Sequence, residues 1–564
     1  MLYNTLSRNS SLGDDDQFMD VRGMVSTRLM AIKDSLPDVP NFKMPSLAKI
    51  QAASKLSALS LNGISLNGIF SNDTSASGQN SVDRDQAHGL GNDSTTLDGV
   101  LEDLTGDIVI MGGYRGSILR SAEPPHHQLW APVKVGLNMR KANLEVGLDD
   151  EDEETAEDHI IASGMLQNIG PIDISRKFFK KLRSCENART GKLRVWDYGY
   201  DWRLSPSRLS ERLLDFLQTL PSNQPGIPVM QRGALVVAHS LGGLITRHAV
   251  NERPELFSGV LYAGTPQRCV NILGPLRNGD AVLFNDKLLT AQVNFSIRTS
   301  FALLPDDGFC FVDRNTGEGY PVDFFDAASW VRWRLSPSVA PPLPPYNRQQ
   351  QYLPLSSLLP NSLLRPRGEC KGTMGPSKES PVSNIQNRTA ISPHLSSHTN
   401  AQASPVAAAA AAAAANGTPS PASPAVDPER LERNMEYLQR TLTSISRFRR
   451  ETAHRPSHEA GNAYPPFAVI YGKSIPTVYA ARVNGRDAIP CSDAYDDLIF
   501  RPGDGVVLAK ESMLPEGYSI VHGGRVRTER GHITMLGDMP ALGKALKALL
   551  RGRRKGIGLG EAPA

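Results

Sequence analysis

The stretch that decides the fold reads Leu235-Val236-Val237-Ala238-His239-Ser240-Leu241-Gly242-Gly243. An apolar run typical of a β-strand ends at the small residue Ala238, and the two glycines lead into a helical pattern. A serine at a strand–turn–helix junction is the layout of a nucleophile elbow, whose tight turn strains the serine backbone and lifts its hydroxyl above the sheet. The stretch therefore predicts a serine enzyme that transfers acyl groups.

A serine nucleophile needs a carboxylate, which orients and stabilises the histidine that takes the serine's proton. In α/β-hydrolases the three residues follow in the order serine, acid, histidine. The expected acid is Asp504, because the flanking Gly503 and Gly505 let the backbone turn sharply at a strand edge. An ordinary Asp-Gly turn is the alternative interpretation. Asp306 and Asp307 are weaker competitors that read as loop residues.

The expected base is His532, which lies in a loop just before the last helical pattern. A loop at that place can deliver an imidazole to the serine. His522 lies only ten residues upstream, and either histidine alone could be a solvated loop residue. The order along the chain favours Ser240, Asp504 and His532 as the catalytic triad.

Acyl transfer also needs two backbone N–H groups that bind the developing oxyanion. Leu241 follows the nucleophile at a helix N-terminus and is expected to supply one of them. The second is expected from Tyr114, in the turn that begins with Gly112-Gly113 after an apolar strand. A simple tight turn is one alternative. A nucleotide-binding turn is another, although the G-x-G-x-x-G order is missing.

Strands and helices alternate along the foldable part of the chain. Apolar runs predict strands over residues 108–111, 193–196, 234–238, 260–263 and 467–471. Apolar spacing and capping residues predict helices over residues 178–182, 206–220, 241–250 and 539–550, with another that starts at 427. This alternation predicts an α/β fold of the α/β-hydrolase type, with a mostly parallel central sheet and helices on both of its faces.

Composition divides the chain of 564 residues into folded and unfolded parts. The unfolded parts are poor in aromatic residues or rich in proline and alanine, so they cannot bury much apolar surface. We predict a largely disordered arm over 1–100, a first core part over 101–336, a disordered insertion over 337–428, a second core part over 429–552 and a fraying basic tail over 553–564. A short helix over 45–59 interrupts the arm.

The charge and cysteine content exclude several classes of function. The net charge of +3 is small for this length, so we expect no nucleic-acid partner. Five scattered cysteines lack metal spacing and favour a reduced compartment. No metal or cofactor is expected, and the acidic run 149–154 is interpreted as a solvated loop. No signal peptide or membrane span is visible, which predicts an intracellular protein that is cytoplasmic or peripheral on membranes.

Several blocks of the chain resemble the lecithin:cholesterol acyltransferase family, which includes lysosomal phospholipase A2 and phospholipid:diacylglycerol acyltransferase. The similar blocks are 110–117, Tyr200-Asp201-Trp202-Arg203, 238–243 and Gly503-Asp504-Gly505-Val506-Val507, where Val506 replaces the family's threonine. The resemblance covers about 107–336 and 465–550. It implies that Ser240, Asp504 and His532 form the triad and that Tyr114 and Leu241 are the oxyanion donors.

The resemblance also implies a mobile, lipid-contacting lid. It would lie near 125–165, with its central part at 130–148. The disulfide that closes the family's lid has no counterpart here, because no cysteine occurs between Ser117 and Lys181. The implied activity is lipid O-acyl transfer from a lipid ester to an alcohol. Hydrolysis with water as the acceptor, a catalytically silent binding protein and a peripheral membrane adaptor are the alternatives.

Overall fold

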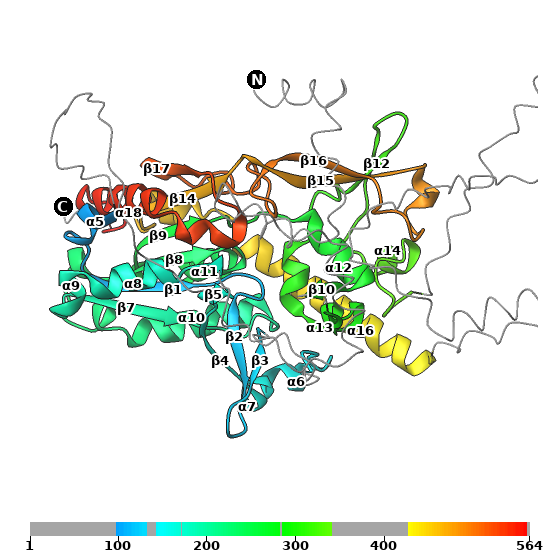
Figure 1. The fold of residues 1–564 in the computed structure, drawn as a ribbon, viewed down its shortest axis with the longest axis horizontal. Coiled ribbons are helices and arrows are strands. Elements are labelled where there is room, and N and C mark those ends of the chain that lie inside the picture. The colour runs from blue at the N-terminus through cyan, green and yellow to red at the C-terminus, as the bar shows by residue number, and fades with distance from the viewer. Residues whose placement is uncertain (1–96, 132–142, 171, 283–284, 341–426, 561–564) are drawn as a thin grey trace, which may run out of the picture. The chain divides into compact units, whose positions relative to one another are not determined.

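The computed structural model describes residues 97–131, 143–170, 172–282, 285–340 and 427–560 (Figure 1). The helix predicted over 45–59 lies outside the described residues. So do residues 1–96 of the predicted arm and residues 341–426 of the predicted insertion. The described chain begins in helix α5 (Leu97–Leu101), whose leucines and Val100 are buried. The predicted boundary at residue 100 therefore falls inside a helix that packs on the core.

Six parallel strands form the central sheet, in the order β17-β14-β9-β8-β1-β7. Their bounds are β1 (Gly106–Met111), β7 (Leu193–Tyr198), β8 (Ala234–His239), β9 (Phe257–Ala263), β14 (Phe467–Gly472) and β17 (Ile520–Thr528). Five of them were predicted from apolar runs, and the sixth, β17, was missed. All six residues of β8 are buried, as expected for a strand that is covered on both faces.

Helices cover both faces of this sheet. Helix α18 (Met539–Arg554) packs on the face to which Gly259 of β9 points, since a Cβ there would lie 3.6 Å from Leu549 Cβ. Side chains alternate along a strand, so Tyr262 points to the opposite face. Tyr262 interacts there with Arg247 of helix α11 (Leu241–Glu252). The α/β-hydrolase architecture predicted from the sequence is thus the observed one.

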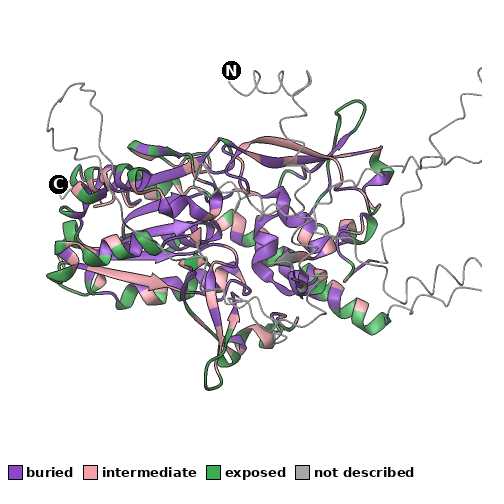
Figure 2. Ribbon diagram, in the orientation of Figure 1, coloured by how far each residue is buried: buried purple, intermediate pink, exposed green. Residues whose placement is uncertain are grey.

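Two further helices pack beside α11. Helix α10 (Pro206–Thr219) buries Leu209, Leu213 and Leu217, as its apolar spacing predicted. Helix α16 (Pro428–Glu451) begins after Asp427, whose side chain accepts a hydrogen bond from Glu429 N. Figure 2 shows the resulting burial, with the inner strands of the central sheet buried and the edge strands β7 and β17 only partly so. Helix α8 (Arg176–Ser184), which was also predicted, buries Phe178, Phe179 and Leu182.

The predicted basic tail is wrong at its start. Helix α18 continues to Arg554, so the boundary expected at 552 falls inside it. Arg553 is buried, and its guanidinium donates to the carbonyls of Val229, Arg232 and Gly558. These bonds attach the end of the helix to the rest of the fold.

Of the four smaller sheets in the described chain, two have more than two strands. One has the order β13-β12-β15-β16, with β12 (Phe311–Asp313), β13 (Gly319–Tyr320), β15 (Ile475–Val483) and β16 (Leu498–Gly503). The other has the order β3-β2-β4, with β2 (Ser117–Ser121), β3 (Gln128–Trp130) and β4 (Ile160–Met165). The second sheet and helices α6 (Asp150–Glu154) and α7 (Ala156–His159) account for much of the predicted lid.

The acidic run at 149–154 is helical, which corrects the loop prediction. Asp149 caps α6, since its side chain accepts from the N3 backbone and Asp152 returns a bond to the Asp149 N–H. Arg433 and Arg440 of α16 pair with the acidic residues from across the chain. The positive charges of these two arginines offset part of the negative charge of the acidic run. That clustered negative charge is the reason why the sequence predicted a solvated loop.

Candidate active site

Ser240 lies in the sharp turn between β8 and α11. Its backbone angles are φ +54° and ψ −125°, a strained conformation for a residue with a side chain. Ser240 N donates to Ala263 O at 2.8 Å, and Gly243 N donates to Ser240 O at 2.9 Å. The residue is 7% exposed. The structure therefore places Ser240 in the elbow geometry that its flanking residues predicted.

Only glycine fits opposite the serine. A Cβ at Gly113, in the turn after β1, would overlap Ser240 Cβ and lie 3.0 Å from Ser240 Oγ. A Cβ at Gly242 would overlap the carbonyl oxygen of Gly112. The turn after β1 and the first turn of α11 are thus packed backbone against backbone around the hydroxyl.

Asp504 is fully buried at the carboxyl end of the sheet. It follows β16, and a Cβ at Gly472, the last residue of β14, would lie 2.7 Å from Asp504 Cβ. One carboxylate oxygen, Oδ1, accepts hydrogen bonds from Val506 N at 3.0 Å and Val507 N at 2.7 Å. The Gly503–Val507 loop thus holds the carboxylate in one orientation and leaves Oδ2 for another partner.

That partner is His532, the first residue of a short 3₁₀ helix (His532–Gly537) that precedes α18. His532 Nδ1 lies 2.8 Å from Asp504 Oδ2, and His532 N donates to Asp504 O at 2.8 Å. Because an ionised carboxylate only accepts, this bond places the proton on Nδ1 and leaves Nε2 to accept from a hydroxyl. The His532 side chain is 7% exposed.

The strand end of β9 connects this pair to the serine. Gly264 follows Ala263, the residue whose carbonyl holds Ser240 N. A Cβ at Gly264 would lie 3.0 Å from His532 Nδ1 and 3.1 Å from Asp504 Oδ2. Residues 240, 504 and 532 therefore meet around one glycine. Within the described ranges no hydrogen bond joins the Ser240 hydroxyl to His532; such bonds are often long before a substrate binds.

His239, which precedes the nucleophile, supports the base directly. Its Nε2 donates to the carbonyl of His532 at 2.8 Å, and the two rings lie 4.8 Å apart. Burial, together with the neighbouring His532, lowers the pKa of His239 from 6.5 to about 3. His239 is therefore neutral near pH 7 and acts as a fixed donor. The sequence analysis assigned it no role.

The turn after β1 has the form of an oxyanion-binding loop. Gly116 N donates to Gly113 O at 2.8 Å, which closes the turn. Tyr200 OH donates to Gly112 O at 2.8 Å and so fixes that carbonyl. Tyr114 follows Gly113 in this turn, and Leu241 begins α11 beside Ser240. Leu241 thus adjoins the serine directly, and Tyr114 adjoins Gly113, which lies against it; their role as oxyanion donors stays a prediction.

Arg115 fastens this loop to a distant segment, and the sequence analysis missed it. Its φ is +60°, and its buried guanidinium pairs with Asp280 at 2.8 Å and hydrogen-bonds Asn294 Oδ1. Tyr114 OH lies 2.7 Å from Ser300 Oγ. These contacts join residues that are 165 to 186 positions apart in the chain. Local sequence patterns carry no signal of them.

The Tyr200–Arg203 block is a buried scaffold. Arg203 and Asp201 form an ion pair with both side chains 3% exposed, and Arg203 Nε lies 2.8 Å from Asp201 Oδ1. Trp202 Nε1 donates to Ser117 O at 3.3 Å. Through the bond from Trp202 to Ser117, this block supports the loop that follows β1.

The competing candidates lie elsewhere. Asp306 pairs with Arg449 and Asp307 pairs with Arg268, and both aspartates are at least half exposed. His522 is exposed on β17, where its carbonyl accepts from Arg551. The structure therefore brings none of the three into the environment of Ser240.

The central part of the predicted lid, residues 130–148, is hydrogen-bonded to the core near both of its ends. Trp130 Nε1 donates to Arg115 O at 2.8 Å, and Val146 N donates to Ser296 Oγ at 3.1 Å. Residues 132–142 between these anchors lie outside the described part of the chain. Mobility of the segment stays a prediction.

The described residues contain neither a metal-binding cluster nor a helix that could cross a membrane. No group of three or more His, Cys, Asp or Glu side chains there is arranged to hold a metal ion. No helix among them combines the length and the apolar character that a membrane crossing requires.

Comparison with known proteins leaves the activity open. No family model matches the chain. The chain is 35% identical over 467 residues to a Saccharomyces cerevisiae protein described as "Uncharacterized protein YJR098C", and the match covers 82% of this chain and 64% of that protein's length. A chain in "The crystal structure of Tle4-Tli4 complex" is 11% identical, with 79% of this chain and 98% of that chain covered and a TM-score of 0.42. That likeness is too weak to carry an argument. The resemblance to the lecithin:cholesterol acyltransferase family therefore rests on the sequence motifs alone.

Proposed function

We propose that the protein is a serine-dependent acyl-transfer enzyme that forms an acyl-enzyme at Ser240 from a lipid ester. The observation that carries the proposal is the buried pair of His532 Nδ1 and Asp504 Oδ2, 2.8 Å apart, beside a serine with φ +54°. A strained serine and a buried acid–base pair at the same strand ends have a common explanation in nucleophilic catalysis.

The first half-reaction transfers the acyl group to the enzyme. Ser240 Oγ attacks the ester carbonyl while His532 Nε2 takes its proton, and Asp504 stabilises the imidazolium. The backbone N–H groups of Tyr114 and Leu241 bind the oxyanion. When the tetrahedral intermediate collapses, the ester C–O bond breaks and His532 returns the proton to the leaving alcohol.

The second half-reaction decides the class of enzyme. His532 takes a proton from an acceptor, whose oxygen attacks the acyl-enzyme, and the proton then returns to Ser240. An alcohol acceptor gives a lipid O-acyltransferase, which the motif likeness favours. Water gives a lipase or phospholipase with the same residues.

A lipid-turnover assay tests the proposal. The full chain is incubated with phospholipid vesicles that carry a labelled acyl chain, with and without diacylglycerol or sterol as the acceptor. We expect labelled acyl ester in the acceptor for a transferase and labelled free fatty acid for a hydrolase. Ser240→Ala and His532→Ala should abolish both products, whereas His522→Ala, at an exposed histidine, should keep them. Absence of both products from the wild type would favour a silent binding protein.

A further inference from the structure

Helix α11 carries a buried cation that the fold does not neutralise. Arg247 lies two turns after Ser240 and is 4% exposed. Its Nε is buried without a hydrogen-bond partner, and no carboxylate among the described residues forms an ion pair with it. By contrast, the buried Arg115 and Arg203 each pair with an aspartate. A buried guanidinium without a counter-ion is costly, so its retention calls for an explanation.

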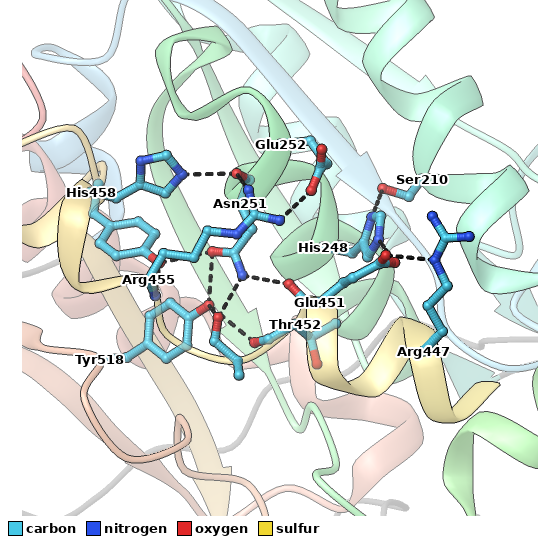
Figure 3. A network of polar contacts seen from close by, with 12 residues as sticks. Ser210, His248, Asn251, Glu252, Arg447, Glu451, Thr452, Arg455, His458 and Tyr518 are labelled. Carbon is cyan, nitrogen blue, oxygen red and sulfur yellow. Dashed lines mark hydrogen bonds and ion pairs between the residues drawn. The ribbon is translucent and has the colours of Figure 1, made fainter. Parts of the chain in front are cut away.

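Asn251, one turn further along α11, is a buried polar side chain with a partner for every donor and acceptor. Asn251 donates from Nδ2 to the carbonyls of Glu451 and Ala453 at 2.7 Å each. Its Oδ1 accepts from Tyr464 OH at 2.8 Å and Tyr518 OH at 2.9 Å. Figure 3 shows this network between α11 and the end of α16. All four hydrogen-bonding positions of the amide are filled, four residues from an arginine whose buried Nε has no partner.

Two further buried donors near Arg247 are unpartnered. Tyr262 is 1% exposed and Thr265 is 3% exposed, and neither hydroxyl has a hydrogen-bond partner. The Thr265 side chain fills the space that a Cβ at Gly243 would take. Gly243 and Arg247 are four residues apart and so lie on one side of α11. Tyr262 lies close enough to Arg247 for their charges to interact.

No carboxylate is among the ionisable groups that act most strongly on Arg247. The ionisable groups that interact with Arg247 are the phenols of Tyr518 and Tyr262 and the cation of Arg449. Burial raises the pKa of Tyr262 and Tyr518 above the usual range, so both phenols stay protonated. Arg449 is already paired with Asp306. The surroundings therefore offer hydroxyl donors and positive charge but no negative charge.

We propose that Arg247, with the hydroxyls of Tyr262 and Thr265, binds a small oxyanion such as phosphate or a carboxylate. A guanidinium presents donors in a fork that matches two oxygens of one such ion, and nearby hydroxyls can donate to the rest. The depth of burial selects a small free ion over a headgroup held in a bilayer. Anion binding by Arg247 does not depend on acyl transfer at Ser240, so the failure of either proposal leaves the other standing.

Thermal unfolding in defined anions tests the site. The full chain is dialysed against 0.5 M chloride and then melted at constant ionic strength in phosphate, acetate or glycerol 3-phosphate. We expect the Tm of the wild type to rise with phosphate or acetate concentration, because an anion that binds only the native state stabilises it. A larger rise in Tm with glycerol 3-phosphate than with phosphate would indicate that the bound anion comes from a lipid headgroup. Arg247→Met should melt above the anion-free wild type and should not respond.

Two matched variants complete the test. Arg253→Gln removes an exposed arginine at the end of the same helix and should keep the wild-type response. Arg247→Lys keeps the charge without the fork and should bind phosphate at least tenfold more weakly by calorimetry. An equal response of wild type and Arg247→Met would overturn the site. So would a wild type that neither responds nor carries an anion in native mass spectrometry.

Discussion

Replacing His239 by glutamine should change how the stability of the protein depends on pH. The pKa of His239 is about 3 in the folded protein, against 6.5 for an ordinary histidine, chiefly because the ring is buried. The unfolded chain therefore binds a proton on this residue as the pH falls below 6.5, while the folded chain does not. Folding stability is lost as the pH falls, at about 1.4 kcal/mol per pH unit. Between pH 7.5 and pH 5 the loss amounts to about 2 kcal/mol.

Glutamine removes this titration and keeps an N–H that can donate to the carbonyl of His532. Urea unfolding at pH 7.5, 6 and 5 should then show His239→Gln gaining about 2 kcal/mol on the wild type over that range. The exposed His522→Gln should follow the wild type. A difference between wild type and His239→Gln that stays constant with pH would refute the reasoning that a neutral, buried His239 supports the base.

Three further substitutions probe the site. Asp504→Asn should lower kcat for a soluble ester by about 10³- to 10⁴-fold with less change in KM, since an amide favours the wrong imidazole tautomer. Gly113→Ala should lower kcat at least about 100-fold because its Cβ overlaps Ser240, whereas Gly319→Ala, in open space, should be silent. Arg203→Met should cost about 3–5 kcal/mol in urea unfolding by leaving Asp201 buried and unpaired. An unchanged kcat in either of the first two variants, or an unchanged urea midpoint in the third, would contradict the corresponding role.

Much of the sheet and of the candidate triad was predictable, for local reasons. A parallel strand covered on both faces, such as β8, is one apolar run, and the elbow is a local pattern of small residues around Ser240. Asp504 and His532 could be selected because the order of residues in α/β-hydrolases is fixed and because glycines or a final helix adjoin them.

The rest depends on contacts between distant residues. Strand β17 was missed because two glycines and alternating exposed residues interrupt its apolar pattern. The acidic helix at 150–154 pairs with arginines of α16 that lie more than 280 positions away. The bonds of Arg115 to Asp280 and Asn294 are equally remote. Propensity and periodicity report only neighbours in the chain, so they cannot reveal such pairs.

The most direct test of the central claim is the site of covalent labelling by a fluorophosphonate, located by peptide mass spectrometry. A second group of serine, histidine and glutamate makes the test stringent. Ser210 Oγ lies 2.9 Å from His248 Nδ1, and His248 Nε2 lies 3.1 Å from Glu451 Oε2. The account predicts one adduct, on Ser240, that is lost in Ser240→Ala and kept in Ser210→Ala. No adduct, or an adduct on Ser210, would contradict it.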